Sequence, residues 1–404
     1  MRQLNTDLRG ASRLAIAATL GVADLVEAMH RTISRVPLPL GKPVTGRTTG
    51  ITGLVYGTVR GVTRLVGGGV DAALAAVTPL LPELEGSGDW PGRERLVCAL
   101  NGVLGDYLER TGNPLAIPMS LRSGGLDLAL DRAALSAAFP AASGRLLVAI
   151  HGLCMSDMQW TRGGVDRVGR LAGSLGATAV HLRYNTGLHV SSNGRAFAEQ
   201  LEALLEAWPV PVTELILLGH SMGGLVARSA VHAARSDGLE WPRRLRSMVF
   251  LGTPHHGAPL ERGGHWVEKV LGVSPYSAAF TRLGRVRSAG ITDLRHGSML
   301  EEDWKGQDRF AHGVDTRRPL PLPEGVACYA IAATLGRRDD PLARRLVGDG
   351  LVPLDSALGR HPERERRLAF HEEHTWVAFG TGHLDLLGCD RAFRRIGRWL
   401  AAPA

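Results

Sequence analysis

One serine framed by glycines has surroundings that suit covalent chemistry. Ser221 lies in Gly219-His220-Ser221-Met222-Gly223-Gly224, directly after the apolar run Leu215–Leu218 and directly before a helical pattern over Leu225–Ala234. A GxSxG segment between a strand and a helix forms a sharp turn that exposes the serine hydroxyl for attack on a carbonyl. The glycines permit the strained backbone and close packing of such a turn. Ser221 is the predicted nucleophile, and the alternative is a serine in an ordinary strand-to-helix turn.

A serine hydroxyl needs a base to take its proton and a third group to orient that base. After a serine of this kind the acid comes next along the chain and the histidine last. We predict Asp349, in the turn-rich segment 348–353, as the acid, and His383, in segment 380–385, as the base. The competing acids and bases are Asp339, Asp340, Asp355, Asp385, His371 and His374.

The oxygen that becomes negative during attack needs two backbone N–H donors. Met222 directly follows the predicted nucleophile and supplies one of them. The second is expected from His151-Gly152-Leu153-Cys154, which follows the apolar run Leu146–Ile150. Leu153 is the predicted donor and Cys154 the alternative, while a catalytic role for the Cys154 thiol is not expected.

The remaining motifs do not predict a metal or a cofactor. Adjacent His255 and His256 point in different directions and have no Cys or HxxxH partner, so we interpret them as structural or substrate-lining. No P-loop and no GxGxxG after a strand is present, which argues against nucleotide use. Tyr184 and Asn185 follow another apolar run and either line the site or serve a turn.

Alternating strands and helices are expected from Arg93 onward. Apolar runs separated by helical stretches are typical of a mostly parallel central sheet with helices on both faces. A stretch of about 65 residues over 259–323 interrupts this alternation and is predicted to be an inserted cap, whose Trp266 and Leu271 would help to form an acyl pocket. The predicted strands are Leu146–Ile150, Ala177–Leu182, Leu215–Leu218, Met248–Leu251, Val326–Ala333 and Thr375–Phe379, and the clearest helices are Gly194–Ala207 and Leu225–Ala234.

Residues 1–92 differ from the α/β region 93–404 and are predicted to be a separate helical region with a linker. Asp7–Ile33 has the pattern of an amphipathic helix, and Thr48–Val77 is a second helical stretch with glycines at spacings of three and four. Small residues in one row allow helices to approach closely. This hairpin either docks on the catalytic body or makes peripheral membrane contact, and residues 79–92 read as the linker.

Composition excludes several protein classes. The 404 residues are 44% hydrophobic and 21% charged, which is ordinary for a globular protein and unlike a disordered chain or a fibre. The net charge is +8, but the basic residues are dispersed and aromatic residues are few, so we expect no nucleic-acid partner. No apolar run is long enough to span a membrane. Four scattered cysteines and an N-terminus unlike a secretion signal favour a cytoplasmic protein.

In their order along the chain, these blocks resemble the α/β-hydrolase superfamily of the bacterial lipase and esterase type. The resemblance covers residues from about 145 to 400 and rests on His151-Gly152, segments 219–224 and 252–257, Gly348-Asp349-Gly350-Leu351-Val352-Pro353 and Gly382-His383-Leu384-Asp385. The chain is also similar to the hydrolase domain of GPI inositol-deacylase-like proteins, which cleave an acyl ester from a lipid.

The resemblance implies an α/β-hydrolase fold and an acyl-enzyme mechanism. It implies Ser221, Asp349 and His383 as the catalytic triad, with Leu153 and Met222 at the oxyanion hole. We expect a serine carboxylic-ester hydrolase acting on a lipid or small-molecule ester. The alternatives are an acyltransferase with the same triad and a catalytically idle, membrane-associated scaffold. The helical region 1–92 departs from the pattern of secreted lipases.

Overall fold

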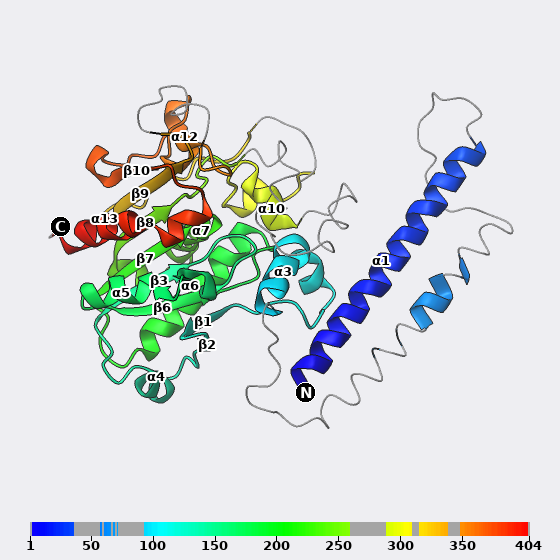
Figure 1. The fold of residues 1–404 in the computed structure, drawn as a ribbon, viewed down its shortest axis with the longest axis horizontal. Coiled ribbons are helices and arrows are strands. Elements are labelled where there is room, and N and C mark those ends of the chain that lie inside the picture. Colours follow the sequence, from blue (N-terminus) through cyan, green and yellow to red (C-terminus); the bar gives the residue numbers. More distant parts are fainter. Residues whose placement is uncertain are drawn as a thin grey trace. The chain divides into compact units, whose positions relative to one another are not determined.

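A computed structural model describes residues 2–35, 57–58, 60–65, 68, 71, 93–258, 288–308, 315–337 and 348–402 (Figure 1). The chain divides into two compact units. The first comprises Met1–Arg93 with Leu108–Ala116, and the second comprises Glu94–Tyr107 with Ile117–Ala404. No helix within these described ranges is both long and apolar enough to cross a bilayer.

The first unit is built on the long helix α1 (Arg2–Arg35), which confirms the helix predicted over 7–33. Ion pairs tie it to residues distant in sequence: Arg13 Nη2 lies 2.7 Å from Asp71 Oδ2, and Arg93 Nε lies 2.6 Å from Asp7 Oδ2. Most of the second predicted helix, over 48–77, lies outside the described residues, and its described positions 57–58 and 60–65 are helical. The predicted linker, 79–92, also lies outside them.

The second unit contains a mostly parallel sheet, as predicted. Within the described residues the sheet has eight strands in the order β10-β9-β8-β7-β3-β6-β1-β2, and the strands from β6 to β10 in this order are parallel. Their bounds are β3 (Arg145–Ile150), β6 (Thr178–Arg183), β7 (Glu214–His220), β8 (Leu245–Leu251), β9 (Ala327–Thr334) and β10 (Thr375–Phe379).

The antiparallel edge of this sheet is the part that the sequence pattern did not predict. β1 (Ser120–Ser123) pairs antiparallel with both β6 and β2 (Leu126–Asp127). The two strands are short and only one of their residues is buried, so they leave no apolar run in the sequence. Gly124 and Gly125 make the turn between them at positive φ, where glycine is favoured.

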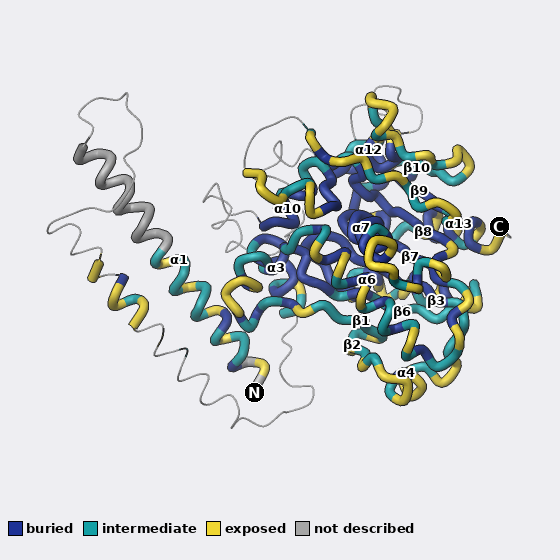
Figure 2. The backbone as a smooth tube through the Cα atoms, turned by 180° about the vertical axis from the view of Figure 1, so that it is seen from behind, coloured by how far each residue is buried: buried dark blue, intermediate teal, exposed yellow. Residues whose placement is uncertain are grey.

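Helices cover both faces of the sheet because its central strands are apolar on both sides. Along β3, Leu146, Val148 and Ile150 face a core shared with α6 and α7, whereas Leu147 and Ala149 face a core shared with α5 and α13. Figure 2 shows buried residues concentrated along α7 and the central strands. The longer helices are α3 (Arg93–Arg110), α5 (Arg167–Ser174), α6 (Val190–Ala207), α7 (Met222–Asp237) and α13 (Asp390–Ala401).

The remaining elements are short and lie between these strands and helices. A separate hairpin pairs β4 with β5. The short elements are α4 (Arg132–Ala138), η2 (Asp157–Trp160), β4 (Thr161–Arg162), β5 (Val165–Asp166), η3 (Trp241–Arg244), α10 (Ala289–Leu294), η5 (Glu301–Asp303), α12 (Leu354–Ala357), η6 (Arg364–Arg366), η7 (Glu372–His374) and η8 (Leu384–Gly388).

The predicted cap over 259–323 is only partly described. Its described part contains α10 and the 3-10 turn η5. Residues 259–287, which include Trp266 and Leu271, lie outside the described residues, as do 309–314. The assignment of these two side chains to an acyl pocket therefore stays a prediction.

Candidate active site

Ser221 occupies a strained turn between β7 and α7. Its φ of 54° and ψ of −125° lie in a region that non-glycine residues rarely adopt, and such strain is concentrated at functional sites. The Ser221 N–H donates to the carbonyl of Leu251 on the next strand, 2.8 Å away. A Cβ on Gly223 would collide with the Ile150 carbonyl oxygen, so glycine is needed here for α7 to pack against β3. This is the strand–turn–helix context that the sequence predicts.

The structure brings Asp349 and His383 together. His383 Nδ1 lies 2.6 Å from Asp349 Oδ2, and both residues are at least 95% buried. Asp349 Oδ1 accepts the N–H groups of Leu351 and Val352, at 2.9 and 2.7 Å. With the carboxylate as its partner, Nδ1 carries the proton, so the opposite nitrogen, Nε2, is left to accept one.

Ser221 and His383 line one small cavity of about 20 Å³. A space of this size holds about one water molecule. Apart from Ser221, His383 and His220, the lining is apolar, and it consists of Leu153, Met155, Pro254, Ala258, Leu294, Leu351, Val352 and Leu384. The predicted nucleophile and base therefore open onto the same space, which is lined mostly by apolar side chains.

His220 is a positioning residue that sequence reasoning missed. Its Nε2–H donates to the backbone carbonyl of His383, 3.2 Å away, and the two imidazole rings are 4.9 Å apart. Burial, and after it the neighbouring His383, hold the pKa of His220 well below its usual value, so this ring is neutral. The only sequence signal for this role was its place beside Ser221.

The loop after β3 is fixed in a way that favours Leu153 over Cys154 as the oxyanion donor. The Cys154 N–H already donates to Thr186 Oγ1, at 3.1 Å, whereas Leu153 lines the cavity with Ser221. The Tyr184 hydroxyl donates to the His151 carbonyl, at 2.8 Å, and so anchors the start of this loop. Tyr184 is thus a buried support for the loop.

Met222 is the first residue of α7, and the first N–H groups of a helix have no partner inside it. Its N–H is therefore at the N-terminal end of the helix, directly beside Ser221. Gly152 keeps the facing loop close, since a Cβ there would lie 3.0 Å from Ser221 Cβ. Met222 and Leu153 remain the predicted oxyanion donors.

The competing acids and bases lie elsewhere. Asp355 is exposed and 3.6 Å from Arg360, and Asp385 accepts the Gly382 N–H at 3.2 Å. The rings of His371 and His374 contact each other, with centroids 5.3 Å apart. Asp339 and Asp340 lie outside the described residues.

Burial raises the pKa of the Cys154 thiol to about 12, which leaves this thiol protonated and a poor nucleophile.

The histidine pair after β8 has two separate environments. His255 is buried, and its Nδ1 accepts a hydrogen bond from Arg228 Nη1, 3.2 Å away. The ring of His256 instead lies 4.9 Å from that of His361. Within the described residues no group of three His, Cys, Asp or Glu side chains is arranged to hold a metal ion.

Comparison with known proteins adds a family match over part of the chain. The model of the PGAP1-like alpha/beta domain family matches residues 141–317. This range contains Leu153, Ser221 and Met222, while Asp349 and His383 lie beyond it. No curated protein matches the chain.

Several solved structures are similar in fold. The mature form of Bacillus licheniformis lipase BlEst2 is 16% identical, covers 70% of this chain and 98% of its own, and has a TM-score of 0.44. Lipase 1 from Pelosinus fermentans is 12% identical, over 65% of this chain and 99% of its own, with a TM-score of 0.40. Staphylococcus hyicus lipase is 14% identical, over 64% and 95%, with a TM-score of 0.36.

The sheet order and the turn at Ser221 agree with the family match, and the resemblance predicted from the sequence is confirmed. The chain has an α/β-hydrolase fold, and its residues 141–317 match the PGAP1-like alpha/beta domain family.

Proposed function

We propose that this protein is a serine ester hydrolase that forms an acyl-enzyme on Ser221. The observation that carries the proposal is the strained Ser221 turn opening onto the same cavity as His383, whose Nδ1 is 2.6 Å from the buried Asp349. A nucleophile, a base and an orienting acid in this relation are the parts of a serine-hydrolase triad.

In the proposed mechanism Ser221 Oγ attacks the ester carbonyl while His383 Nε2 takes the hydroxyl proton. Asp349 keeps the Nδ1 proton in place and stabilises the imidazolium that forms. The N–H groups of Leu153 and Met222 bind the negative oxygen. His383 then gives the proton to the leaving alcohol, and water hydrolyses the acyl-enzyme by the same steps.

The apolar lining around Ser221 supports a substrate with an apolar acyl group. Leu153 and Leu351 lie on separate loops, Leu294 is the last residue of α10, and all three line the small cavity. A space of about 20 Å³ is much smaller than an acyl chain, so substrate entry requires these segments to move apart. The acyl-chain length that the enzyme prefers then indicates how far these segments can separate.

The test is hydrolysis of p-nitrophenyl esters from C2 to C16 by the full chain beside Ser221→Ala. We expect the variant to lose at least roughly a thousandfold in kcat, as removal of a triad member generally does. Equal thermal unfolding of both proteins is the control for folding. Equal rates in the two proteins would rule out Ser221 as the nucleophile.

The proposal extends to the acyl acceptor and to membrane contact. Added alcohols in the same assay separate hydrolysis from acyl transfer, because a transferase makes a new ester in place of free acid.

The first unit exposes Leu8, Val62 and Leu65, which is the observation that favours peripheral membrane contact. Co-sedimentation of the full chain with vesicles, beside Leu65→Gln, tests it, and absence of binding by the unmodified protein would contradict it.

A further inference from the structure

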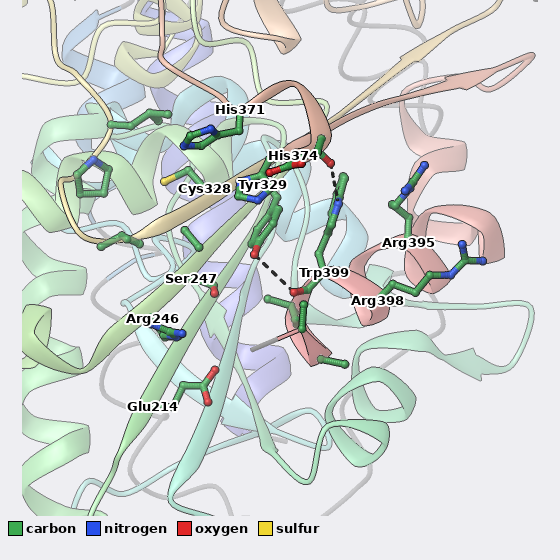
Figure 3. A pocket seen from close by; sticks show the side chains of 18 of the residues that line it. Glu214, Arg246, Ser247, Cys328, Tyr329, His371, His374, Arg395, Arg398 and Trp399 are labelled. Atoms are coloured by element: carbon green, nitrogen blue, oxygen red, sulfur yellow. Dashed lines mark hydrogen bonds between the residues drawn. The ribbon is translucent and has the colours of Figure 1, made fainter. Parts of the chain in front are cut away.

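A second and much larger cavity, of about 1090 Å³, lies at the opposite edge of the sheet from Ser221 (Figure 3). Its lining includes residues at the amino ends of three parallel strands: Glu214 of β7, Arg246 of β8 and Ala327 of β9. β7 runs from Glu214 to His220, next to Ser221, so at about 3.3 Å per residue the two sites are about 20 Å apart. This cavity is therefore separate from the proposed active site.

The charged side chains around this cavity are mostly positive. Four arginines line it, Arg145, Arg246, Arg395 and Arg398, against only two glutamates, Glu214 and Glu373. Arg145 is paired with Glu214 at 2.9 Å. Among the residues that the structure describes, no carboxylate forms an ion pair with any of the other three arginines.

These three guanidinium groups come from two elements, α13 and β8. Arg395 and Arg398 project from α13 on one side in Figure 3, and Arg246 stands at the start of β8 on the other side of Tyr329. The charge of Arg246 acts on Tyr329, where it opposes the rise in pKa of the phenol that burial causes. A ligand seated between these walls meets positive charge from two directions.

Between these charges the cavity has a rigid aromatic wall. The rings of Tyr329 and Trp399 stack, with centroids 5.0 Å apart, and the ring of His374 lies 4.4 Å from that of Tyr329. The Trp399 indole N–H donates to the backbone carbonyl of Glu373, at 3.0 Å, which fixes the ring. The Arg395 guanidinium carbon lies 5.6 Å from the centre of the Trp399 ring. The wall is thus formed before any ligand binds.

We propose that this cavity binds a small organic anion that carries phosphate groups. Guanidinium groups match phosphate oxygens with paired hydrogen bonds, and three of those lining the cavity have no carboxylate partner among the described residues. Their separation on two walls fits a ligand with more than one negative charge. The volume suits a small molecule, and the half-buried Leu322, Pro323 and Val326 of the lining offer an apolar surface for its organic part.

Two kinds of ligand carry phosphate groups of this type: a soluble phosphate ester and the headgroup of an anionic phospholipid. The probes are ATP and pyrophosphate, followed by calorimetry, and phosphatidylcholine vesicles with and without phosphatidate, followed by co-sedimentation. We expect saturable binding of at least one phosphorylated probe to the full chain. Binding of ATP or pyrophosphate assigns the soluble source, and binding only to phosphatidate vesicles assigns the headgroup.

Variants locate the binding. Arg246→Gln and Arg398→Gln are each expected to weaken it by about tenfold or more, because each removes charge-assisted hydrogen bonds. Arg394→Gln is the matched control, since Arg394 is exposed on the same helix as Arg398 but does not line the cavity. Arg246 and Arg398 are exposed, so both variants should fold, and thermal unfolding checks this.

Two results would overturn the proposal. One is the absence of saturable binding to every phosphorylated probe. The other is an equal loss in Arg394→Gln and in the two cavity variants, which would indicate a diffuse attraction to the basic surface. None of these measurements uses ester hydrolysis, so the outcome does not depend on whether Ser221 is the nucleophile.

Discussion

The two ends of the parallel strands, which we call the carboxyl edge and the amino edge of the sheet, differ in their electrostatic environment. At the carboxyl edge, the buried Asp349 carboxylate accepts hydrogen bonds from two backbone N–H groups and from His383, and His383 lines a small, mostly apolar cavity. At the amino edge, Arg246, Arg395 and Arg398 line an open space of about 1090 Å³, and in the described part of the chain none of them has a carboxylate partner. The first arrangement holds reacting groups in place, and the second leaves charge available for a partner that arrives from solution.

The largest effect is expected from Asp349→Asn at the carboxyl edge. The amide cannot hold the correct His383 tautomer, so kcat for ester hydrolysis should fall by about 10⁴. Binding of phosphorylated probes at the amino edge should not change, since the sites are at opposite ends of β7. Equal losses of both properties would show that the two edges are coupled or that the variant is misfolded.

Stability should fall in acid because histidines of the carboxyl edge are buried and neutral. Burial lowers the pKa of His151 to about 4 and that of His220 well below its usual value. Below pH about 6.5 the unfolded chain binds protons that the folded chain does not, so each such group costs up to about 1.4 kcal/mol per pH unit. Chemical denaturation at pH 7 and pH 5 measures this, and an unchanged free energy of unfolding would contradict it.

Gly152→Ala probes how closely the oxyanion loop must approach the nucleophile. The new Cβ would lie 3.0 Å from Ser221 Cβ and 3.2 Å from His220 Nδ1, so the loop has to shift by a few tenths of an ångström. Small displacements of reacting groups are costly, and we expect kcat to fall by about ten- to a hundredfold. Steady-state kinetics check this, and full activity would mean that the loop does not supply a donor.

His220→Ala tests the positioning of His383 with a smaller effect. Loss of the donor to the His383 carbonyl should lower kcat by about tenfold and leave KM nearly unchanged, because this hydrogen bond acts on the position of His383. A matched rise in KM with constant kcat would instead place His220 in substrate binding.

The smallest effect is expected from Arg246→Gln on ester hydrolysis and on folding. Arg246 is exposed and has no carboxylate partner among the described side chains, so stability should change by no more than about 0.5 kcal/mol. Hydrolysis by this variant should equal that of the unmodified protein. A clear change in kcat would show that the amino edge regulates the carboxyl edge.

The sequence predicted the parts of the molecule that have local patterns. Runs such as Leu215–Leu218 predict buried strands, and the glycines around Ser221 predict its turn. β1 and β2 were missed because such short, mostly polar strands leave no periodicity. The arginine-lined cavity was missed because its residues, from Arg145 to Trp399, come together only through the parallel strand order. The boundary at residue 92 stays a prediction.

The short antiparallel edge has a consequence for how this protein behaves at high concentration. An exposed edge strand offers free N–H and C=O groups on which a neighbouring molecule can add a strand. β2 has only two residues, and next to it the guanidinium of Arg122 is held by the buried Asp157, at 2.7 Å. An added strand would find too few pairing groups on β2, and the nearby guanidinium of Arg122 is already paired with Asp127 and Asp157, so this side of the sheet is protected against aggregation.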